Sequence, residues 1–541
     1  MRIESICLLL PVLCLHGAAE GDIGPEGGPI SMVAGRKQLF LDDVAVQEIT
    51  GLVRTMHQPE KRGAVLKPDL PTDGNLVQIR SAPMWVPDEQ VYKLVYLAYA
   101  MDERCPVNPA LAVSKDGVHW EKPIVGEVEV FGSKENNWLN MGDGLRWPEN
   151  AFDAQVYDPD DPNPNRRYKG LLGAIGRIPV VSADCIHWTK LDVPPIPSSD
   201  EATLTYDREH GRFLAAVKTG NEFGRAFNIS ISEDFEHWTA PRFLFGADAE
   251  DQPIAVEIIR RRIADPGIAM PFFVDPDPAT GWKPPADEKH FPTWRAECYN
   301  IGVFPYEGLY IGLPMMYFPT GTELPARTNT DGFDLIRLAV SRDLETWTHV
   351  DRRQAFIGPS RIDDGKVGVF DRTQLCVTNR PVEHGDELWF YYVGFKWRHP
   401  IYEFNQDGSP RDPATLSPED RADFEEGRGA VCLAVLRRDG FVSLDADAEG
   451  GALLTRPLQW AGSHLFLNLD APDGEARVEI LDGAGQPVPG FSEAEAEPVT
   501  GDRIRAEVTW RSEAGLDALA GTVVQLRVHL ANGRLYAFWT E

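Results

Sequence analysis

The chain has 541 residues, of which 43% are hydrophobic and 25% are charged. These proportions are ordinary for a globular protein and exclude a disordered or fibrous chain. At roughly 100–200 residues per domain, the length requires several domains or one large repeat architecture. The 53 Lys and Arg residues against 83 Asp and Glu residues give a formal net charge of −30. A strongly acidic chain repels phosphate backbones, so we expect no nucleic-acid partner.

The first residues have the pattern of a secretory signal peptide. A cation at Arg2 precedes an apolar run over residues 6–15, and small residues follow at 17–19. This order predicts a signal peptide at residues 1–19 and a secreted or periplasmic protein. No later run approaches the roughly 20 apolar residues of a membrane-spanning helix, so we expect no membrane span.

An internal repeat is the most informative feature of the chain. The pattern S-x-D-x-x-x-W occurs four times, starting at Ser114, Ser182, Ser232 and Ser341. Ser and Asp side chains bond nearby backbone amides and fix a tight turn after an apolar strand. The Trp then covers the neighbouring sheet. We therefore expect structural rather than catalytic roles for the Asp residues of the repeat.

A second pattern precedes each copy of the repeat and once more precedes a degenerate fifth copy. It consists of a short apolar strand, a polar turn and an aromatic-led strand, which is typical of a hairpin. Each unit then contains about four strands, and five units fill residues 75–445. Radial repetition of four-stranded sheets predicts an all-β, five-bladed β-propeller. Residues 20–74 form the N-terminal segment and lead into the propeller.

Two long inserts and a change of pattern complete the organisation. Residues 248–296 and 396–427 are rich in Pro, Asp and charge, and long loops on a rigid scaffold usually shape a binding mouth. Within the second insert, residues 417–426 predict a short helix with Ser417 as its cap. From residue 446 to 541 the repeat stops and alternation at period two predicts a C-terminal β-sandwich.

Carboxylates stand at the start of the predicted innermost strands. In a propeller these positions face a shared axial pocket. Four of the five blades offer an acidic residue there: Asp153 in blade two, Asp200 and Glu201 in blade three, Glu297 in blade four and Asp371 in blade five. Crowded carboxyl groups shift one another's pKa values, so that one stays protonated while another is ionised. Glycosidic cleavage needs this division. Alternatively, these groups sit in turns, pair with arginines or bind a cation.

Other polar residues at the same positions suit the binding of sugar hydroxyls. We expect substrate contacts from Arg80, Asp200, Glu201, Tyr299, Asn300, Gln374 and, before blade one, His57. The widely spaced cysteines and histidines do not have the spacing of a zinc site. We predict no metal ligands and no cofactor, and the channel leaves room for a structural cation.

Several segments resemble glycoside hydrolase families 32 and 43, above all the secreted family-32-like proteins of planctomycete-type bacteria. The segments that carry the likeness are Leu39–Asp43, His57–Lys61, Phe304–Leu313, Phe356–Ser360, Asp386–Tyr392 and Gly533–Trp539. Glu297-Cys298 resembles the Glu-Cys acid/base motif of family 32. The Trp-x-x-Asp-Pro-Asn-Gly nucleophile motif of that family is absent. A family-43-like arrangement would instead use Asp153, Glu297 and Asp371.

The leading hypothesis is a secreted glycoside hydrolase acting on an extracellular poly- or oligosaccharide. Glu297 would be the general acid, and Asp153 or Asp371 the base or nucleophile. The alternative is a non-catalytic propeller that binds carbohydrate or protein at the cell surface. The two differ in geometry, because an enzyme needs two opposed carboxylates in one accessible pocket. The sequence leaves the oligomeric state open.

Overall fold

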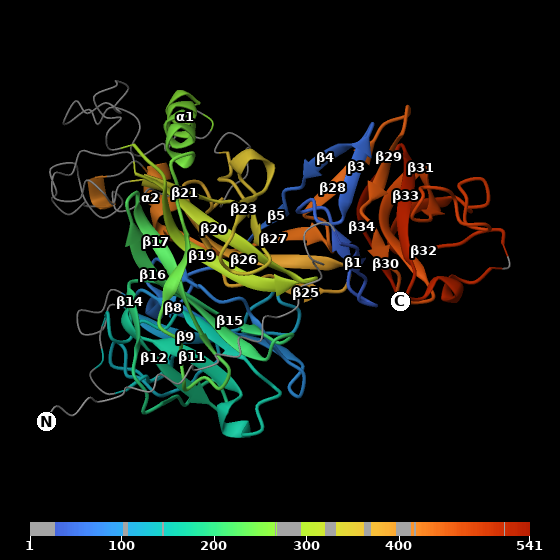
Figure 1. Ribbon diagram of the computed structural model, residues 1–541. Coiled ribbons are helices and arrows are strands. Elements are labelled where there is room, and N and C mark those ends of the chain that lie inside the picture. The colour runs from blue at the N-terminus through green and yellow to red at the C-terminus, as the bar shows by residue number, and fades with distance from the viewer. Residues whose placement is uncertain are drawn as a thin grey trace, which may run out of the picture.

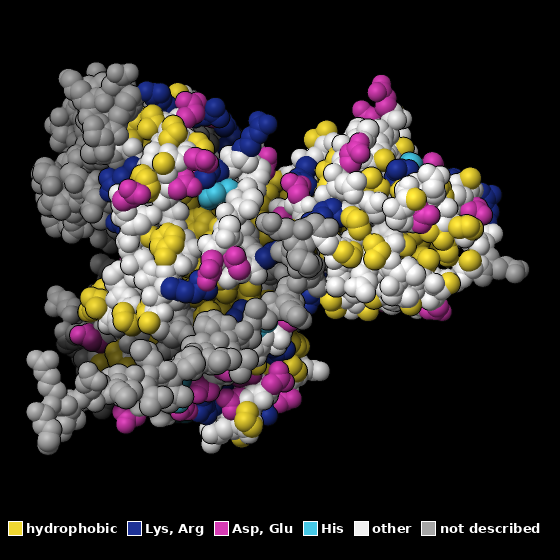
Figure 2. All heavy atoms as spheres, viewed as in Figure 1, with side chains coloured by type: hydrophobic (Ala, Val, Ile, Leu, Met, Phe, Trp, Pro, Cys, Tyr) yellow, Lys and Arg dark blue, Asp and Glu magenta, His cyan; other side chains and the backbone are white. Residues whose placement is uncertain are grey.

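The computed structural model describes residues 28–100, 107–142, 145, 147–265, 267, 294–319, 332–361, 369–396, 413–415, 418–512 and 514–541. The predicted signal peptide lies outside the described residues, as does most of each long insert. Figure 1 shows two bodies, the propeller and a C-terminal sheet, side by side. On the face seen in Figure 2, acidic side chains are scattered over both bodies rather than gathered in one patch. Charge distributed in this way favours solubility.

Five separate sheets form the propeller, which confirms the predicted all-β, five-bladed fold. Blade 1 contains β6 (Val77–Gln78), β7 (Met84–Val86), β8 (Val91–Ala98) and β9 (Asn108–Ser114). Blade 2 contains β10 (Ala154–Tyr157), β11 (Tyr168–Leu172), β12 (Ile175–Ser182), β13 (Thr189–Lys190) and β14 (Ile196–Ser199). Blade 3 contains β15 (Ala202–Asp207), β16 (Arg212–Asn221), β17 (Gly224–Ser232) and β18 (Arg242–Gly246).

The last two blades follow the same plan. Blade 4 contains β19 (Glu297–Tyr306), β20 (Leu309–Pro319), β21 (Gly332–Ile336), β22 (Ala339–Ser341) and β23 (Thr348–His349). Blade 5 contains β24 (Gln374–Val377), β25 (Val382–His384), β26 (Glu387–Phe395), β27 (Gly429–Arg437) and β5 (Glu60–Leu66). The outer strand of the last blade therefore comes from the N-terminal segment.

This N-terminal strand closes the ring. It pairs antiparallel with β27, from Glu60 opposite Val435 to Leu66 opposite Val431. Lys61 of β5 forms an ion pair with the buried Asp371 at 2.7 Å, and the Tyr392 hydroxyl donates to the same carboxylate at 2.8 Å. Asp371 thus holds β5 onto blade 5.

The repeat motif forms the tight turn that its residues predict. In the first copy, the Ser114 hydroxyl oxygen accepts from the Gly117 amide at 2.9 Å, and Asp116 accepts from the His119 amide at 2.8 Å. The indole of Trp120 donates to the Gly117 carbonyl at 3.1 Å. The His119 amide and ring hold the pKa of Asp116 well below its usual range. The motif is therefore structural.

Hydrogen bonds between blades cross the propeller axis. The Asn379 side chain of blade 5 accepts from the Ala82 amide at 2.8 Å and donates to the Leu204 carbonyl at 2.6 Å. The Thr203 hydroxyl donates to the Ile301 carbonyl at 2.7 Å. These bonds satisfy polar groups that the converging strands bury. The Asn379–Leu204 bond joins blades 5 and 3, which are not neighbours, and therefore crosses the axis.

The C-terminal body is one eleven-stranded sheet rather than a part built from residues 446–541 alone. Its strands are β1 (Ile30–Ser31), β2 (Gln38–Leu39), β3 (Val46–Thr50), β4 (Val53–Met56), β28 (Val442–Ala446), β29 (Gly451–Thr455), β30 (Leu458–Gln459), β31 (Leu465–Leu481), β32 (Val499–Val508), β33 (Val523–Ala531) and β34 (Gly533–Thr540). Four of the strands come from the N-terminal segment. A sandwich arrangement of this body stays a prediction.

Helices are few in the described residues. The short helix α2 (Pro418–Glu425) confirms the prediction in the second insert, whereas α1 (Asp251–Ala264) lies in the first insert and was not predicted. The short 3₁₀ helices are η1 (Pro71–Asp73), η2 (Pro164–Arg166), η4 (Asp351–Arg353), η6 (Pro413–Thr415) and η7 (Leu516–Leu519). Among the described residues no helix has the length and apolarity needed to cross a membrane.

The close approach of blades 4 and 5 predicts that alanine at Gly302 will destabilise the protein. A Cβ at this position would lie 2.1 Å from the Thr378 carbonyl oxygen, in backbone that cannot move freely. We expect the free energy of unfolding to fall by about 2–3 kcal/mol. Chemical denaturation measures it. The matched control is Gly483→Ala, where nothing lies within 4 Å of the added Cβ. An equal loss in both variants would contradict the prediction.

Candidate functional site

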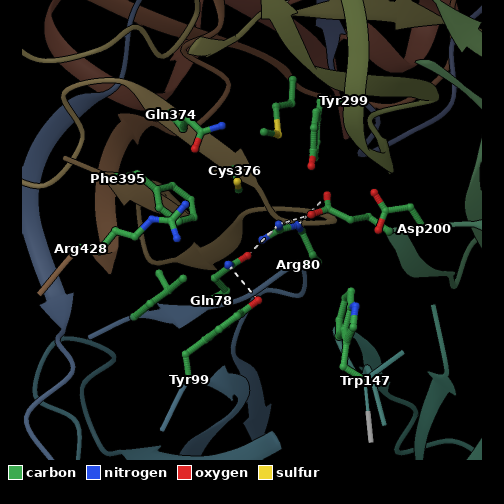
Figure 3. A pocket seen from close by; sticks show the side chains of 13 residues that line it. Gln78, Arg80, Tyr99, Trp147, Asp200, Tyr299, Gln374, Cys376, Phe395 and Arg428 are labelled. Carbon is green, nitrogen blue, oxygen red and sulfur yellow. Dashed lines mark hydrogen bonds and ion pairs between the residues drawn. The ribbon is translucent and has the colours of Figure 1, made fainter. Parts of the chain in front are cut away.

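A cavity of about 250 Å³ lies at the end of the propeller where the innermost strands begin. Such a position is typical of ligand sites, which are concave and combine apolar walls with a few polar groups. Figure 3 shows its lining side chains converging from several blades. They are Leu76, Gln78, Arg80, Tyr99, Trp147, Asp200, Glu201, Tyr299, Met315, Gln374, Cys376, Phe395 and Arg428. We call this cavity the axial pocket.

Arg80 and Glu201 form an ion pair at the centre of the axial pocket. The Arg80 guanidinium donates from Nε to Oε2 at 2.9 Å and from Nη2 to Oε1. It also donates to Gln78 at 2.9 Å, and Gln78 donates to the Tyr99 hydroxyl at 3.0 Å (Figure 3). Only 4% of the Arg80 side chain and 12% of the Glu201 side chain are exposed. This bidentate geometry fixes both groups.

Asp200 is the more accessible carboxylate of the pocket, with 34% of its side chain exposed. Lys218 of β16 donates to its Oδ2 at 2.7 Å, and Arg177 of β12 bonds its backbone carbonyl. Burial alone would raise the pKa of Asp200, but Lys218, Arg177 and Arg80 outweigh burial and lower it. Asp200 is therefore ionised at neutral pH.

A β-bulge places Tyr299 in the pocket wall. Cys298 pairs with Met316 and Asn300 with Met315, so Tyr299 is the extra residue of β19. Bulges are frequent beside functional sites, where they redirect a side chain. The Lys218 ammonium lies 3.8 Å from the centre of the Tyr299 ring. Lys218 therefore bridges this ring and Asp200.

Asp334 of β21 is a fully buried carboxyl group directly behind the pocket lining. Gln374, which lines the pocket, donates to its Oδ2 at 3.1 Å. Oδ1 has no hydrogen-bond partner among the described residues. Burial raises the pKa of Asp334 well above its usual range, and the charge of Glu201 adds to this effect. Burial therefore favours the protonated form of Asp334.

Five of the ten predicted site residues line the axial pocket. They are Arg80, Asp200, Glu201, Tyr299 and Gln374. All five were predicted as substrate-binding residues. The three predicted catalytic carboxylates, Glu297, Asp153 and Asp371, are not among the lining residues.

Glu297 forms ion pairs with two arginines. Its Oε2 accepts from Arg225, and its Oε1 accepts from the Arg295 Nε at 2.7 Å. Only 1% of Glu297 is exposed. Gly224 packs against it so closely that a Cβ there would lie 2.5 Å from the Glu297 carboxyl carbon. Both carboxylate oxygens are occupied, so the geometry does not favour the expected acid role.

The other four residues also lie outside the pocket lining. Asp153 bonds the buried Arg177 at 2.7 Å, and Asp371 holds β5 as described above. Asn300 is fully buried in the wall, where its side-chain oxygen accepts from the Ile301 amide at 2.8 Å. His57 contacts the C-terminal sheet instead, with its Nε2 2.6 Å from the Ser443 hydroxyl.

Sequence reasoning missed several lining residues and Asp334. Tyr99, Trp147 and Arg428 lie in or beside loops, which carry no periodic signal. The signal for Asp334 was present, because it is a lone carboxylate inside the apolar strand β21. Charged residues are almost never fully buried without a reason.

One group of residues in the described parts of the chain has the spacing of a metal site. It consists of Asp248, Asp251 and His349, outside the axial pocket. Arg337 and Arg353 bond Asp251 at 2.6 and 2.7 Å, and Arg353 also bonds Asp248. Two guanidinium groups thus already balance the two carboxylates, and the donor set does not suit a cation.

Comparisons with known proteins give similarities in solved structures only. No protein-family model matches the chain, and no curated protein matches it. A solved glycoside hydrolase aligns with 70% of this chain and 92% of its own at 12% identity and a TM-score of 0.39. A GH32 beta-fructofuranosidase of Bombyx mori aligns with 91% of this chain and 93% of its own at 9% identity and a TM-score of 0.33. An alpha-L-arabinanase of Penicillium chrysogenum aligns with 71% and 98% at 12% identity and a TM-score of 0.33.

The buried Asp334 predicts a pH dependence of stability. Above about pH 4 the unfolded chain has released this proton, whereas the native protein releases it only at a higher pH because burial raises the pKa of Asp334. The free energy of unfolding therefore falls as pH rises, by about 1.4 kcal/mol per unit, until pH passes the native pKa. Asp334→Asn removes this contribution. Urea denaturation of both proteins at pH 5–9 measures the difference, and identical pH profiles would contradict the assignment.

The Arg80–Glu201 pair predicts a strong coupling between its two members. Arg80→Gln leaves the Glu201 carboxylate without its guanidinium partner and should cost about 3 kcal/mol of stability. The double variant with Glu201→Gln should lose less than the sum of the single variants. The exposed pair Arg62–Glu60 is the matched control, since Arg62→Gln should cost under about 1 kcal/mol. Additive losses at Arg80 and Glu201 would refute the coupling.

Proposed function

We propose that the protein is a glycoside hydrolase whose sugar substrate binds in the axial pocket. The observation that carries the proposal is that the pKa values of two carboxyl groups, one in the pocket lining and one directly behind it, shift in opposite directions. The cations around Asp200 lower its pKa, and burial raises that of Asp334. Carboxyl groups whose environments separate their pKa values in this way suit the base and the acid of glycosidic cleavage.

Asp200 takes the role of base or nucleophile in this proposal. It is ionised, and it is the more exposed carboxylate of the pocket. Arg177 and Lys218 hold it, one through the backbone and one through the side chain. Both cations come from strands beside the loop that carries Asp200, so the carboxylate is positioned before substrate arrives.

Asp334 takes the role of acid. Burial raises its pKa and so favours the protonated form, and its hydrogen-bond partner Gln374 lines the pocket. If a sugar hydroxyl accepts the hydrogen bond that Gln374 now donates to Asp334, the Asp334 carboxyl is free to turn toward the glycosidic oxygen. Proton transfer to the leaving oxygen from a neutral carboxylic acid is what the reaction requires.

The remaining lining suits a sugar ring. Trp147 is 44% exposed and presents an aromatic face, as Figure 3 shows, with Gln78 and Tyr99 on the neighbouring wall. Aromatic faces pack against the apolar faces of sugars, and amide and hydroxyl groups bond their hydroxyls. The signal pattern of residues 1–19 makes secretion, or release into the periplasm, part of the proposal.

A specific observation favours the second candidate, a non-catalytic carbohydrate-binding propeller. The two carboxylates that line the pocket, Asp200 and Glu201, are adjacent in the chain, and each is paired with a cation. Asp334 lies behind the lining rather than in it. Sugar binding without turnover is the behaviour that this candidate predicts.

Turnover by Asp200→Asn and by wild type on a panel of plant and algal glycans tests the proposal. We expect wild-type hydrolysis and a loss of 10²–10⁴-fold in kcat for the variant, as for removal of a positioned acid or base. Product release, followed by chromatography, is the measurement.

Glu297→Gln and Asp334→Asn complete the design. Asp334→Asn should also lose activity, whereas a loss confined to Glu297→Gln would restore the role expected from the Glu-Cys motif. Substrate binding by a wild-type protein that turns over no glycan would replace the proposal by the binding function.

A further inference from the structure

A second cavity, of about 430 Å³, lies at the opposite end of the propeller axis. Residues where the innermost strands begin line the axial pocket. The second cavity is lined instead by residues at the ends of β10 and β15 and by residues that follow β6 and β24. The Asn379 side chain, bonded to Ala82 and Leu204, lies between the two hollows. We call the second cavity the distal cavity.

Aromatic side chains form the rim of the distal cavity, and inner aromatic rings hold each of them in place. Trp85 is 41% exposed and packs on Tyr92 with ring centres 4.8 Å apart. Tyr206 stacks on Phe213 with ring centres 4.6 Å apart, and Tyr157 packs at a tilt on a neighbouring Tyr at 4.8 Å. Because these rings are already held in place, binding a ligand loses little side-chain conformational entropy.

The charge of the distal cavity is positive. Arg380 lines it, and its Nε donates to the Pro381 carbonyl at 3.2 Å. In the described part of the chain no carboxylate oxygen lies within ion-pair distance of Arg380. Glu383 also lines the cavity, but it pairs with Arg438. Burial lowers the pKa of the Arg380 guanidinium, as expected of a cation that lacks a close counter-ion.

A second guanidinium strengthens this bias. Arg208 lines the same cavity and reaches its nearest carboxylate, Asp160, only at 3.8 Å. Two cations therefore face one hollow on a protein whose net charge is −30. Arg380 is partly buried and has no carboxylate of the described residues within ion-pair distance, so its planar fork is available to bond an anionic group that enters the cavity.

We propose that the distal cavity binds an acidic sugar unit of a glycan, with its carboxylate or sulfate on Arg380 and its ring against Trp85 and Tyr206. Aromatic faces together with an arginine match a ring that carries an anionic substituent. This site goes beyond the proposed function, because it is separate from the axial pocket and needs no turnover. It would hold an acidic glycan while the axial pocket acts on it.

The test uses the full chain carrying Asp200→Asn, so that hydrolysis does not interfere. Calorimetric titration compares oligogalacturonides and sulfated galacto-oligosaccharides with neutral galacto-oligosaccharides of equal length. We expect the acidic ligands to bind at least about tenfold more tightly than the neutral ones. Tighter binding of the oligogalacturonides would identify the anionic group as a carboxylate, and tighter binding of the sulfated ligands would identify it as a sulfate.

Hydrogen exchange and two variants locate the site. Bound acidic ligand should protect residues 82–87 and 379–383, and adding Arg380→Gln should weaken binding at least about tenfold. Trp85→Ala, at an exposed position, should weaken it while leaving the protein folded, which keeps the test valid if Arg380→Gln does not fold. Phe243→Ala, at an exposed position that lines neither cavity, is the matched control and should leave this binding unchanged.

Three results would overturn the proposal. One is equal affinity for neutral and acidic ligands, and another is protection confined to the axial pocket. The third is tighter binding of peptides with a free C-terminal carboxylate, which would assign the cavity to a protein partner. None of these bears on turnover by the axial pocket, so the two proposals fail independently.

Discussion

Convergence of the innermost strands at one axis is the constraint on which the molecule depends. The converging backbone buries polar groups, and Asn379 and Thr203 satisfy several of them by bonding across blades. These bridges cross the axis partway and leave a hollow at each end. Both cavities therefore result from the packing of the blades around the axis. The residues at the strand ends determine what each cavity can bind.

The repeat made the propeller predictable, because its turns depend on local chemistry. Ser114 and Asp116 bond amides within three residues of themselves, so the motif fixes the same turn wherever it occurs. The C-terminal body was harder to predict, because its sheet recruits strands from the far end of the chain. Pairing partners at such separation leave no trace in a local pattern.

The site was predictable only to the level of which segments meet there. Of the residues named at the starts of the inner strands, five line the axial pocket: Arg80, Asp200, Glu201, Tyr299 and Gln374. Side-chain direction was not predictable, because a bulge at Tyr299 shifts the alternation of β19. The pairing of Glu297 with Arg225 was not predictable either, since Arg225 lies in another blade. The position of a carboxylate along its strand thus says less about its chemical role than do the side chains that the fold places next to it.

The strands β1–β4 have a consequence for biosynthesis. They are made first, yet their partners in the eleven-stranded sheet, β28, β29, β30 and β34, are made last. During translation these strands stay unpaired while all five blades emerge from the ribosome. Unpaired strand edges promote aggregation. Synthesis of β34 is thus the step that supplies the partner of β2 and covers the last of these open edges.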